Sequence, residues 1–373
     1  MKIIADENMP NVEKLFSALG DITFANGRSL TNSMIKDADV LLVRSVTKVN
    51  KTLLEGTSVK YVGSATIGTD HVDLDYLKEV GIGFNSAPGC NADAVADYVF
   101  SSLAHLYLNK QLNWLTSTIG IVGQGNVGQC VAARFAALGC SVVAYDPYTE
   151  CAIQGVKLGS LEEVMRSDII SLHAPLTYTG QYPSADMIQG DLINTLQPGQ
   201  TIISAGRGGV INESALMERY RALNGKLNLV FDVWDQEPTP NLSMAAICDI
   251  ATPHIAGYSK QGREKGTWQI YNSLCEFFGL SVKSRFYDAV SSGSIEELHL
   301  NCELSRIESL SRAMLSIYDP SRDSNRFHQV MSSGSVSSFD WLRKYYVERD
   351  EFNTCKIIHP KYQQALTSIG FSE

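Results

Sequence analysis

Three short segments of the sequence each carry one charged or titratable residue that could act on a small molecule. These residues are Arg207 within Ser204–Gly209, Glu237 within Asp232–Pro238 and His254 within Thr252–Gly257. An imidazole titrates near neutral pH, so it can accept a hydroxyl proton in one direction of a reaction and return it in the other. A neighbouring carboxylate orients such a ring and stabilises its protonated form. Taken singly, the three have ordinary explanations: a surface ion pair, a solvated loop acid and a buried histidine.

A glycine-rich motif precedes these segments. It follows an apolar run, opens a predicted helix at Val127–Leu138, and consists of Gly123, Gln124, Gly125, Asn126, Val127 and Gly128. In such a motif the first glycine permits a tight turn, the second lets the backbone approach a pyrophosphate, and the third packs the helix closely. The phosphate oxygens then face the helix N-terminus. The motif predicts a dinucleotide site, and a purely structural glycine turn is the alternative.

Asp146 bears on which dinucleotide is bound. It ends the next predicted strand, close to the usual spacing of about 20 residues after the glycine motif. A carboxylate there accepts hydrogen bonds from the adenosine ribose but repels a 2′-phosphate. The following residues, Pro147–Thr149, supply no cation to offset that repulsion. The sequence therefore predicts NAD as the cofactor.

All these motifs lie at the ends of short apolar runs, each followed by a turn and a helical pattern. That order is typical of parallel α/β sheets, in which ligands bind at the carboxyl ends of the strands. The first predicted sheet contains Lys2–Ala5, Ile22–Ala25, Val40–Val43, Lys60–Gly63 and Gly81–Asn85. The second contains Thr118–Val122, Ser141–Tyr145, Ile169–His173, Thr201–Ala205, Leu229–Val233 and Ile250–Thr252.

The predicted fold is α/β, with two Rossmann-like doubly wound parallel-sheet domains and a small α+β C-terminal domain. A chain of 373 residues exceeds the size of a single core. Long helices are expected at Asp93–Leu108 and Gly262–Leu280, the second packing back on the first domain. Serine-rich turns interrupt the tail at Ser291–Ser294 and Ser332–Ser335. The predicted boundaries are residues 1–100 with 260–283 for substrate, 101–259 for NAD, and 284–373 for the third domain.

Composition argues against several classes of protein. The net charge of −9 disfavours nonspecific nucleic-acid binding, and no apolar run approaches the roughly 20 residues of a membrane span. The first residues, Met1–Asn8, carry two acids and no apolar core, unlike a signal peptide, so a cytoplasmic location is expected. The eight cysteines are scattered singly and predict reduced thiols. No metal site is indicated.

The segments around Arg207, Glu237 and His254 closely resemble the signature motifs of the D-2-hydroxyacid dehydrogenase family, over about residues 40–280. The resemblance implies that Arg207 holds the substrate carboxylate and that Glu237 pairs with His254. His254 would then carry the hydroxyl proton while hydride leaves C2. Further cofactor contacts implied by the resemblance are Ala174, Ala205, Gly206, Asp232 and Gly257.

Within this family the sequence is most similar to members that act on a phosphorylated four-carbon acid. The similarity includes the tail and rests on Asp6–Pro10, Val43–Asn50, Gly68–Asp73, Ala87–Asn91 and His254–Tyr258. It implies NAD-dependent oxidation of 4-phospho-D-erythronate to 2-oxo-3-hydroxy-4-phosphobutanoate in pyridoxal 5′-phosphate synthesis. It also implies a homodimer that associates through residues 284–373. Substrate contacts implied in the same way are Ser45, Thr66 and Tyr258.

Arg44 and Lys48 follow the third predicted strand and are candidates to bind the substrate phosphate. An acidic chain must hold an anion with local cations, and arginine offers a bidentate fork. Solvated loop cations are the alternative interpretation of both residues. The remaining histidines near the motifs are predicted to be structural: His71, His105 and His173.

Two alternative functions remain open at this point. One is 3-phosphoglycerate dehydrogenase or another D-2-hydroxyacid dehydrogenase, against which the similarity of the tail argues. The other, from a different class, is a corepressor-like binding protein that senses NAD, because such relatives can keep the Arg, Glu and His. Turnover of any 2-hydroxy acid would favour the enzyme.

Overall fold

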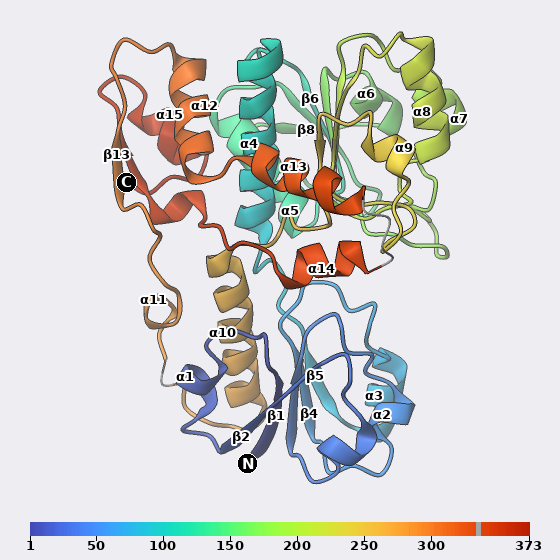
Figure 1. The fold of residues 1–373 in the computed structure, drawn as a ribbon, viewed down its shortest axis with the longest axis vertical. Coiled ribbons are helices and arrows are strands. Elements are labelled where there is room, and N and C mark those ends of the chain that lie inside the picture. The colour runs from blue at the N-terminus through green and yellow to red at the C-terminus, as the bar shows by residue number, and fades with distance from the viewer. Residues whose placement is uncertain (283, 333–336) are drawn as a thin grey trace. The chain divides into compact units, whose positions relative to one another are not determined.

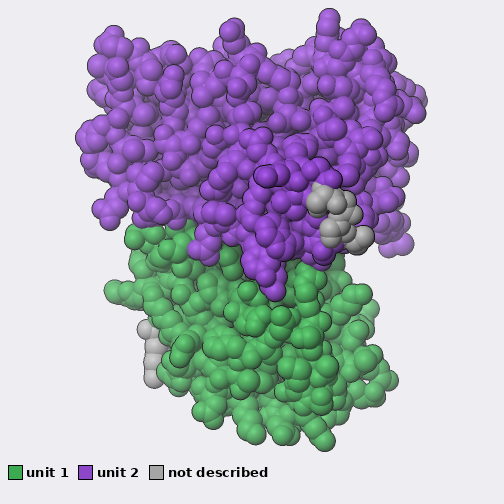
Figure 2. All heavy atoms as spheres, in the orientation of Figure 1, with its two compact units in different colours: residues 1–91, 259–292 green, residues 92–258, 293–373 purple. Residues whose placement is uncertain are grey.

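The computed structural model describes residues 1–282, 284–332 and 337–373, which form two compact units. Unit 1 comprises Met1–Asn91 and Ser259–Ser292, and unit 2 comprises Ala92–Tyr258 and Gly293–Glu373 (Figure 2). The predicted turn residues Ser333, Gly334 and Ser335 lie outside the described residues, as does Lys283 at the end of the predicted first domain. The assignment of separate roles to three domains stays a prediction.

Unit 1 is built on a parallel sheet in the order β2-β1-β3-β4-β5 (Figure 1). All five strands predicted for this part of the chain are present. They are β1 (Lys2–Asp6), β2 (Asp21–Ala25), β3 (Val40–Val43), β4 (Tyr61–Ser64) and β5 (Gly83–Asn85). The helices are α1 (Val12–Phe16), η1 (Asn32–Ile35), α2 (Lys51–Leu54), α3 (Leu74–Val80), α10 (Lys260–Phe277) and α11 (Phe286–Ala289).

The sheet of unit 1 is covered on both faces. Val40 and Leu42 of β3 pack in one core with α1 and α10, whereas Leu41 and Val43 pack in another with α2 and α3. Successive strand residues point to opposite faces, so a strand buried on both sides reads as a continuous apolar run. Helix α10 packs against β4 and β5, as predicted for the segment that returns to the first sheet.

Unit 2 contains a seven-stranded parallel sheet in the order β12-β11-β10-β9-β6-β7-β8. Six of its strands were predicted. The exception is β8, a three-residue edge strand with a lysine at its centre, too short for an alternating pattern to be recognised. The strands are β6 (Ile119–Val122), β7 (Val142–Tyr145), β8 (Val156–Leu158), β9 (Ile169–Leu172), β10 (Thr201–Ser204), β11 (Asn228–Phe231) and β12 (Ile250–Ala251).

The order of these strands creates a crevice. From β6 the chain adds β7 and β8 on one side, then returns to the opposite side of β6 with β9. Such a topological switch point is where doubly wound sheets bind their ligands.

The C-terminal segment is part of the core of unit 2. Helix α12 packs on α4, and Phe327 of α13 stacks on Trp234 with ring centroids 5.5 Å apart. A two-stranded parallel ribbon of β13 (Glu297–His299) and β14 (Lys356–Ile358) gives the tail its α+β character. The helices of unit 2 are α4 (Ala92–Lys110), α5 (Asn126–Ala137), α6 (Leu161–Met165), α7 (Gly190–Asn194), α8 (Glu213–Ala222), α9 (Leu242–Ala245), α12 (Arg306–Ile317), α13 (Pro320–Met331), α14 (Ser338–Lys344), η2 (Phe352–Thr354) and α15 (Gln363–Ser368). None of the helices in the described ranges is long and apolar enough to cross a membrane.

Candidate active site

The glycine motif joins β6 to α5 at the switch point of unit 2. Gly123 has a φ of +91°, and a Cβ on it would lie 2.8 Å from the backbone nitrogen of Ala174. A Cβ on Gly128 would lie 1.9 Å from the carbonyl oxygen of Gly123, so helix and turn are in direct contact. Around Gly125, by contrast, no atom lies within 4 Å of the Cβ position. The loop is therefore tight where it packs and open where a pyrophosphate would approach the helix N-terminus, which fits a dinucleotide.

Asp146 is held beside the glycine motif at the end of β7. Its Oδ2 accepts a 2.7 Å hydrogen bond from the backbone N–H of Gln124, and its Oδ1 accepts one of 2.9 Å from Tyr148. A carboxylate oxygen can accept more than one hydrogen bond, so these contacts leave capacity for ribose hydroxyls. The predicted cofactor contacts Ala174 and Ala205 are buried at the ends of neighbouring strands, after β9 and β10.

Glu237 and His254 form a hydrogen-bonded pair at the carboxyl ends of β11 and β12. His254 Nδ1 lies 2.8 Å from Glu237 Oε2, and Glu237 Oε1 accepts a 3.0 Å hydrogen bond from the backbone N–H of Trp234. Burial acts to raise the pKa of Glu237, but the charge and hydrogen bond of His254, the Trp234 N–H and the charge of Arg343 together lower it below its ordinary value. Glu237 is therefore a carboxylate at neutral pH, and it contacts Nδ1 of His254 rather than Nε2.

Asp232 fixes the backbone that carries His254. Its Oδ1 accepts hydrogen bonds from Thr252 Oγ1 (2.6 Å) and the N–H of Ile255 (2.7 Å), and its Oδ2 accepts one from the N–H of Ala256 (2.9 Å). His254 itself has a φ of +58°, in the left-handed region that non-glycine residues rarely adopt. Such a conformation persists when its surroundings enforce it. Burial raises the pKa of Asp232 above its ordinary value, although the nearby His254 and these hydrogen bonds oppose that shift.

Arg207 lies on the loop after β10, which packs tightly against its neighbours. A Cβ on Gly206 would lie 2.9 Å from the backbone of His173, and one on Gly208 would lie 1.8 Å from the carbonyl oxygen of Trp234. Arg207 donates a 2.9 Å hydrogen bond to the carbonyl oxygen of Gly206. The arginine loop therefore contacts the segment whose Trp234 N–H orients Glu237, and the Arg, Glu and His follow three adjacent strands.

The residues predicted to contact substrate in unit 1 follow β3 and β4. Arg44 donates through Nε to Oδ1 of the buried Asp6 at 3.0 Å, while Ser45 and Lys48 are exposed. Thr66 Oγ1 lies 2.8 Å from Ser64 Oγ and donates to the carbonyl oxygen of Gly68. Arg44 is thus partly neutralised by an acid that sequence reasoning did not connect to it, because the two are far apart in the chain.

Three further histidines were predicted to be structural. His71 Nε2 lies 2.9 Å from Ser64 Oγ, and burial lowers its pKa against the effect of Asp70. His173 Nε2 lies 2.8 Å from Ser171 Oγ, and burial lowers the pKa of His173 to about 3. Both rings are neutral and hydrogen-bonded to a serine of their own sheet. His105 lies in α4, where its Nδ1 is 3.9 Å from Asp319 Oδ1.

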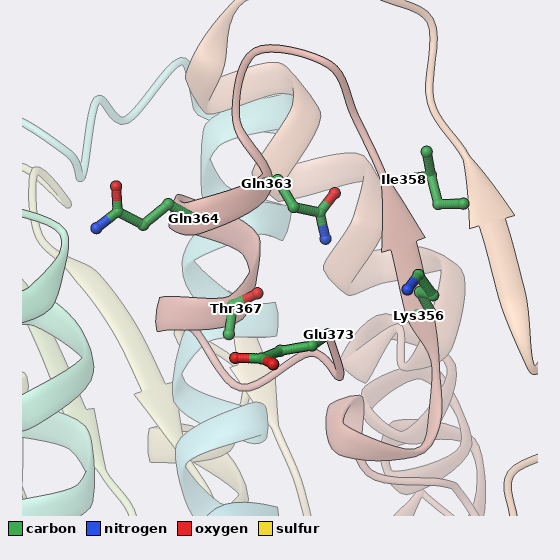
Figure 3. Close-up of a pocket in the computed structure, with 6 residues that line it drawn as sticks. All are labelled: Lys356, Ile358, Gln363, Gln364, Thr367 and Glu373. Carbon is green, nitrogen blue, oxygen red and sulfur yellow. The ribbon is translucent and has the colours of Figure 1, made fainter.

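A pocket of about 590 Å³ lies elsewhere in unit 2, between β14 and α15 (Figure 3). Its lining contains one lysine and one carboxylate among amides, a hydroxyl and an isoleucine, and it includes none of the predicted site residues. It is lined by Lys356, Ile358, Gln363, Gln364, Thr367 and Glu373. In the described parts of the chain, no group of three or more His, Cys, Asp or Glu side chains could hold a metal ion.

Comparison with known proteins identifies the class to which this site belongs. Residues 107–256 match the NAD-binding domain of the D-isomer-specific 2-hydroxyacid dehydrogenases, and residues 290–370 match a domain of unknown function. The fold is similar to that of NAD⁺-bound 3-phosphoglycerate dehydrogenase from Entamoeba histolytica, with a TM-score of 0.63 and 24% identity, over 76% of this chain and 97% of that one. The fold is that of the D-2-hydroxyacid dehydrogenases, and the matched domain is the one that binds NAD in that family.

Closer relatives cover the whole length of the chain. It is 58% identical over 360 residues to a protein of Marinomonas sp. (strain MWYL1) named erythronate-4-phosphate dehydrogenase, covering 96% of this chain and 94% of the relative. A protein of the same name from Shewanella denitrificans is 42% identical over 378 residues, covering 100% and 99% of the two chains. The chain belongs to the erythronate-4-phosphate dehydrogenase family.

Proposed function

We propose that this protein oxidises 4-phospho-D-erythronate to 2-oxo-3-hydroxy-4-phosphobutanoate with NAD, in the synthesis of pyridoxal 5′-phosphate. The observation that carries the chemistry is the 2.8 Å contact between His254 and Glu237 on the ligand-binding edge of an NAD-type sheet. The substrate follows from the full-length relatives named erythronate-4-phosphate dehydrogenase.

The site residues have distinct proposed roles in this reaction. NAD, when bound, accepts the hydride that leaves C2 of the substrate. His254 accepts the hydroxyl proton at Nε2, because its Nδ1 is engaged by Glu237. Glu237 keeps the ring in one orientation and stabilises the charge that the ring gains. Arg207 holds the substrate carboxylate through its planar guanidinium, which fixes C2 relative to NAD and to His254.

The binding residues are proposals of the same kind. The conformation of the glycine loop and the position of Asp146 support contacts to the NAD pyrophosphate and ribose. The proposed cofactor contacts are Gly123, Gln124, Gly125, Asn126, Val127, Gly128, Asp146, Ala174, Ala205, Gly206, Asp232 and Gly257. The proposed substrate contacts are Arg44, Ser45, Lys48, Thr66 and Tyr258.

A side-by-side assay tests the proposed reaction. Purified protein with NAD is given 4-phospho-D-erythronate, 3-phospho-D-glycerate or D-lactate, each with and without a 2-oxo acid that could reoxidise NADH in place. The expected result is the highest kcat/KM with 4-phospho-D-erythronate. A preference for 3-phospho-D-glycerate would contradict the substrate, and no turnover of any 2-hydroxy acid would favour a binding protein that senses NAD.

Asp146→Ala is expected to weaken NAD binding about 10- to 150-fold, because a hydrogen bond to a charged group contributes roughly 1.5–3 kcal/mol. The preference for NAD over NADP should narrow as well, since the repulsion of a 2′-phosphate is removed. Titration of both dinucleotides by fluorescence measures both effects. Asp146→Asn is the matched variant, because it keeps an acceptor for the Gln124 N–H and lacks the charge. Unchanged affinities in both variants would contradict the role of Asp146.

Glu237→Gln is expected to move the acidic limb of the kcat/KM profile for oxidation to lower pH. Because the pKa of Glu237 is lowered, its negative charge is fully present at every pH above the ordinary pKa of a glutamate. The charge is lost only as the pH falls through the lowered pKa of Glu237. Removing the charge disfavours the protonated ring, so the base stays competent in more acidic solution. The expected shift is about one pH unit or more, the usual effect of an opposite charge at this distance. A lower kcat/KM at every pH, with the acidic limb at the same pH as in wild type, would contradict the pairing of Glu237 with His254.

A homodimer and a cytoplasmic location are also proposed. Eight cysteines scattered singly in a long chain support a reducing compartment. Trp341 and Tyr345 of the tail are partly exposed, and aromatic side chains are enriched at interfaces. Light scattering of the full chain should give about twice the 40.9 kDa of one subunit. The full chain is the appropriate sample because the tail also packs in the core of unit 2, and a mass of one subunit would contradict the dimer.

A further inference from the structure

Arg343, an arginine of the C-terminal segment, lies near the catalytic pair Glu237 and His254. Arg343 of α14 places its guanidinium carbon 5.7 Å from the ring centroid of Tyr258 and 5.9 Å from that of Phe339. Tyr258 directly follows the His254 segment and is a proposed substrate contact. The charge of Arg343 also acts on Glu237, as one of the charges that lower the pKa of that carboxyl.

The guanidinium of Arg343 has unused binding capacity. Its Nε is buried and has no hydrogen-bond partner, whereas the guanidinium has a side-chain hydrogen bond with Tyr258 and interacts with the charges of Glu237 and Asp340. Aromatic rings stabilise a guanidinium through its faces and leave the N–H groups at its edge available. A half-buried cation with an unsatisfied donor is costly unless a ligand supplies an acceptor.

The other arginines of this part of unit 2 have structural partners instead. Arg134 forms ion pairs with Asp93 and Asp97. Arg349 donates through Nη2 to the carbonyl oxygens of Ala94 and Ala256, while its Nε and Nη1 have no hydrogen-bond partner. Arg44 in unit 1, the cation that sequence reasoning favoured, is paired with the buried Asp6. Arg343 is distinguished by its position, because it contacts Tyr258 and its charge acts on Glu237 of the catalytic pair.

We propose that Arg343 binds the phosphate group of the substrate. The inference rests on the proposed function, which places a carboxylate at one end of the substrate and a phosphate at the other. Arg207 is assigned to the carboxylate, so a second planar fork is required for the phosphate oxygens. The match to a domain of unknown function includes Arg343, so that domain contributes a residue to substrate recognition in addition to its packing in unit 2.

The test compares substrates in two arginine variants of the full-length protein. Arg343→Met should lower kcat/KM for 4-phospho-D-erythronate about 10- to 150-fold, the effect of losing one hydrogen bond to a charged group. It should lower kcat/KM for D-erythronate by a smaller factor, because that substrate has no phosphate to lose, whereas the loss of the Arg343 charge near Glu237 affects both substrates alike. Arg326→Met is the matched control. Arg326 also stacks on an aromatic residue of the tail, with its guanidinium carbon 5.1 Å from the ring centroid of Trp341. Arg326→Met should leave kcat/KM unchanged for both substrates.

Inorganic phosphate provides a second probe that does not depend on turnover of the weaker substrate. As a competitive inhibitor of wild-type protein it should lose affinity in Arg343→Met by a factor similar to the loss in kcat/KM, and keep its affinity in Arg326→Met. An equal fall with both substrates, or unchanged phosphate inhibition, would overturn the assignment of Arg343 to the phosphate. Failure of the proposed function would look different, because wild type would then not oxidise 4-phospho-D-erythronate at all.

Discussion

His254→Gln is expected to lower kcat for 4-phospho-D-erythronate by about 10²- to 10⁴-fold, the usual contribution of general acid–base catalysis. Glutamine keeps a polar side chain of similar reach but cannot accept and return the hydroxyl proton. NAD binding should be unchanged, because the glycine loop and Asp146 do not depend on the imidazole. Steady-state kinetics and a separate titration of NAD measure the two effects.

The chain offers a matched control for this substitution. His299 and Glu297 form another histidine–glutamate contact, with Nε2 and Oε1 2.6 Å apart on the exposed ribbon strand β13. His299→Gln removes the same chemical pair outside the candidate site and should leave kcat within a factor of two or so of wild type, as for most surface substitutions. More than about a third of wild-type activity in His254→Gln would contradict its role as the base.

The sequence predicted that the candidate catalytic residues share one edge of the sheet, because parallel sheets impose a simple rule. Arg207, Glu237 and His254 each follow an apolar strand, and the carboxyl ends of parallel strands share one edge. Family resemblance then supplied their roles. The sequence could not show that His254 adopts a left-handed φ, or that Asp232 enforces it by accepting three hydrogen bonds from the same loop. Those features depend on which backbone donors meet in three dimensions.

The fold was predictable to a similar degree. The strand β3, buried on both faces, was recognised from its continuous apolar run, and α10 was correctly expected to rejoin the first sheet. The short edge strand β8 was missed, since three residues are too few to define a period. Within the tail, sequence reasoning recognised a small α+β region but did not anticipate that Phe327 would stack on Trp234.

Cations were the hardest residues to assign from sequence. Arg44 was singled out because it adjoins a strand end, yet its partner Asp6 lies on a neighbouring strand and became visible only in the structure. Arg343 carried no signal, because it lies in a polar tail helix without a recognisable motif. Its importance depends on a contact with Tyr258 across 85 residues of chain.

A buried acid, Asp97, joins three parts of unit 2. It lies inside α4, is fully buried, and accepts a 2.6 Å hydrogen bond from Arg134 of α5 through Oδ1. Its Oδ2 accepts one of 2.9 Å from the backbone N–H of Phe352 in the C-terminal segment. The Asp97 carboxylate thus accepts hydrogen bonds both from α5 and from the C-terminal segment. Arg134 keeps a second, more exposed partner in Asp93.

Asp97→Ala is expected to destabilise unit 2 by about 3–5 kcal/mol, because it leaves the buried Arg134 guanidinium with only the more exposed Asp93 to compensate its charge. The melting temperature should fall by roughly 6–20 °C, at about 2–4 °C per kcal/mol for a unit of this size. Asp97→Asn should lose less, since the amide oxygen still accepts one of the two hydrogen bonds. Lys157→Met is the control: it removes an exposed ion pair with Glu163 of the same unit and should cost under about 1 kcal/mol. Calorimetry of the three variants measures these effects, and equal melting temperatures for Asp97→Ala and Lys157→Met would show that the buried Asp97 does not stabilise unit 2.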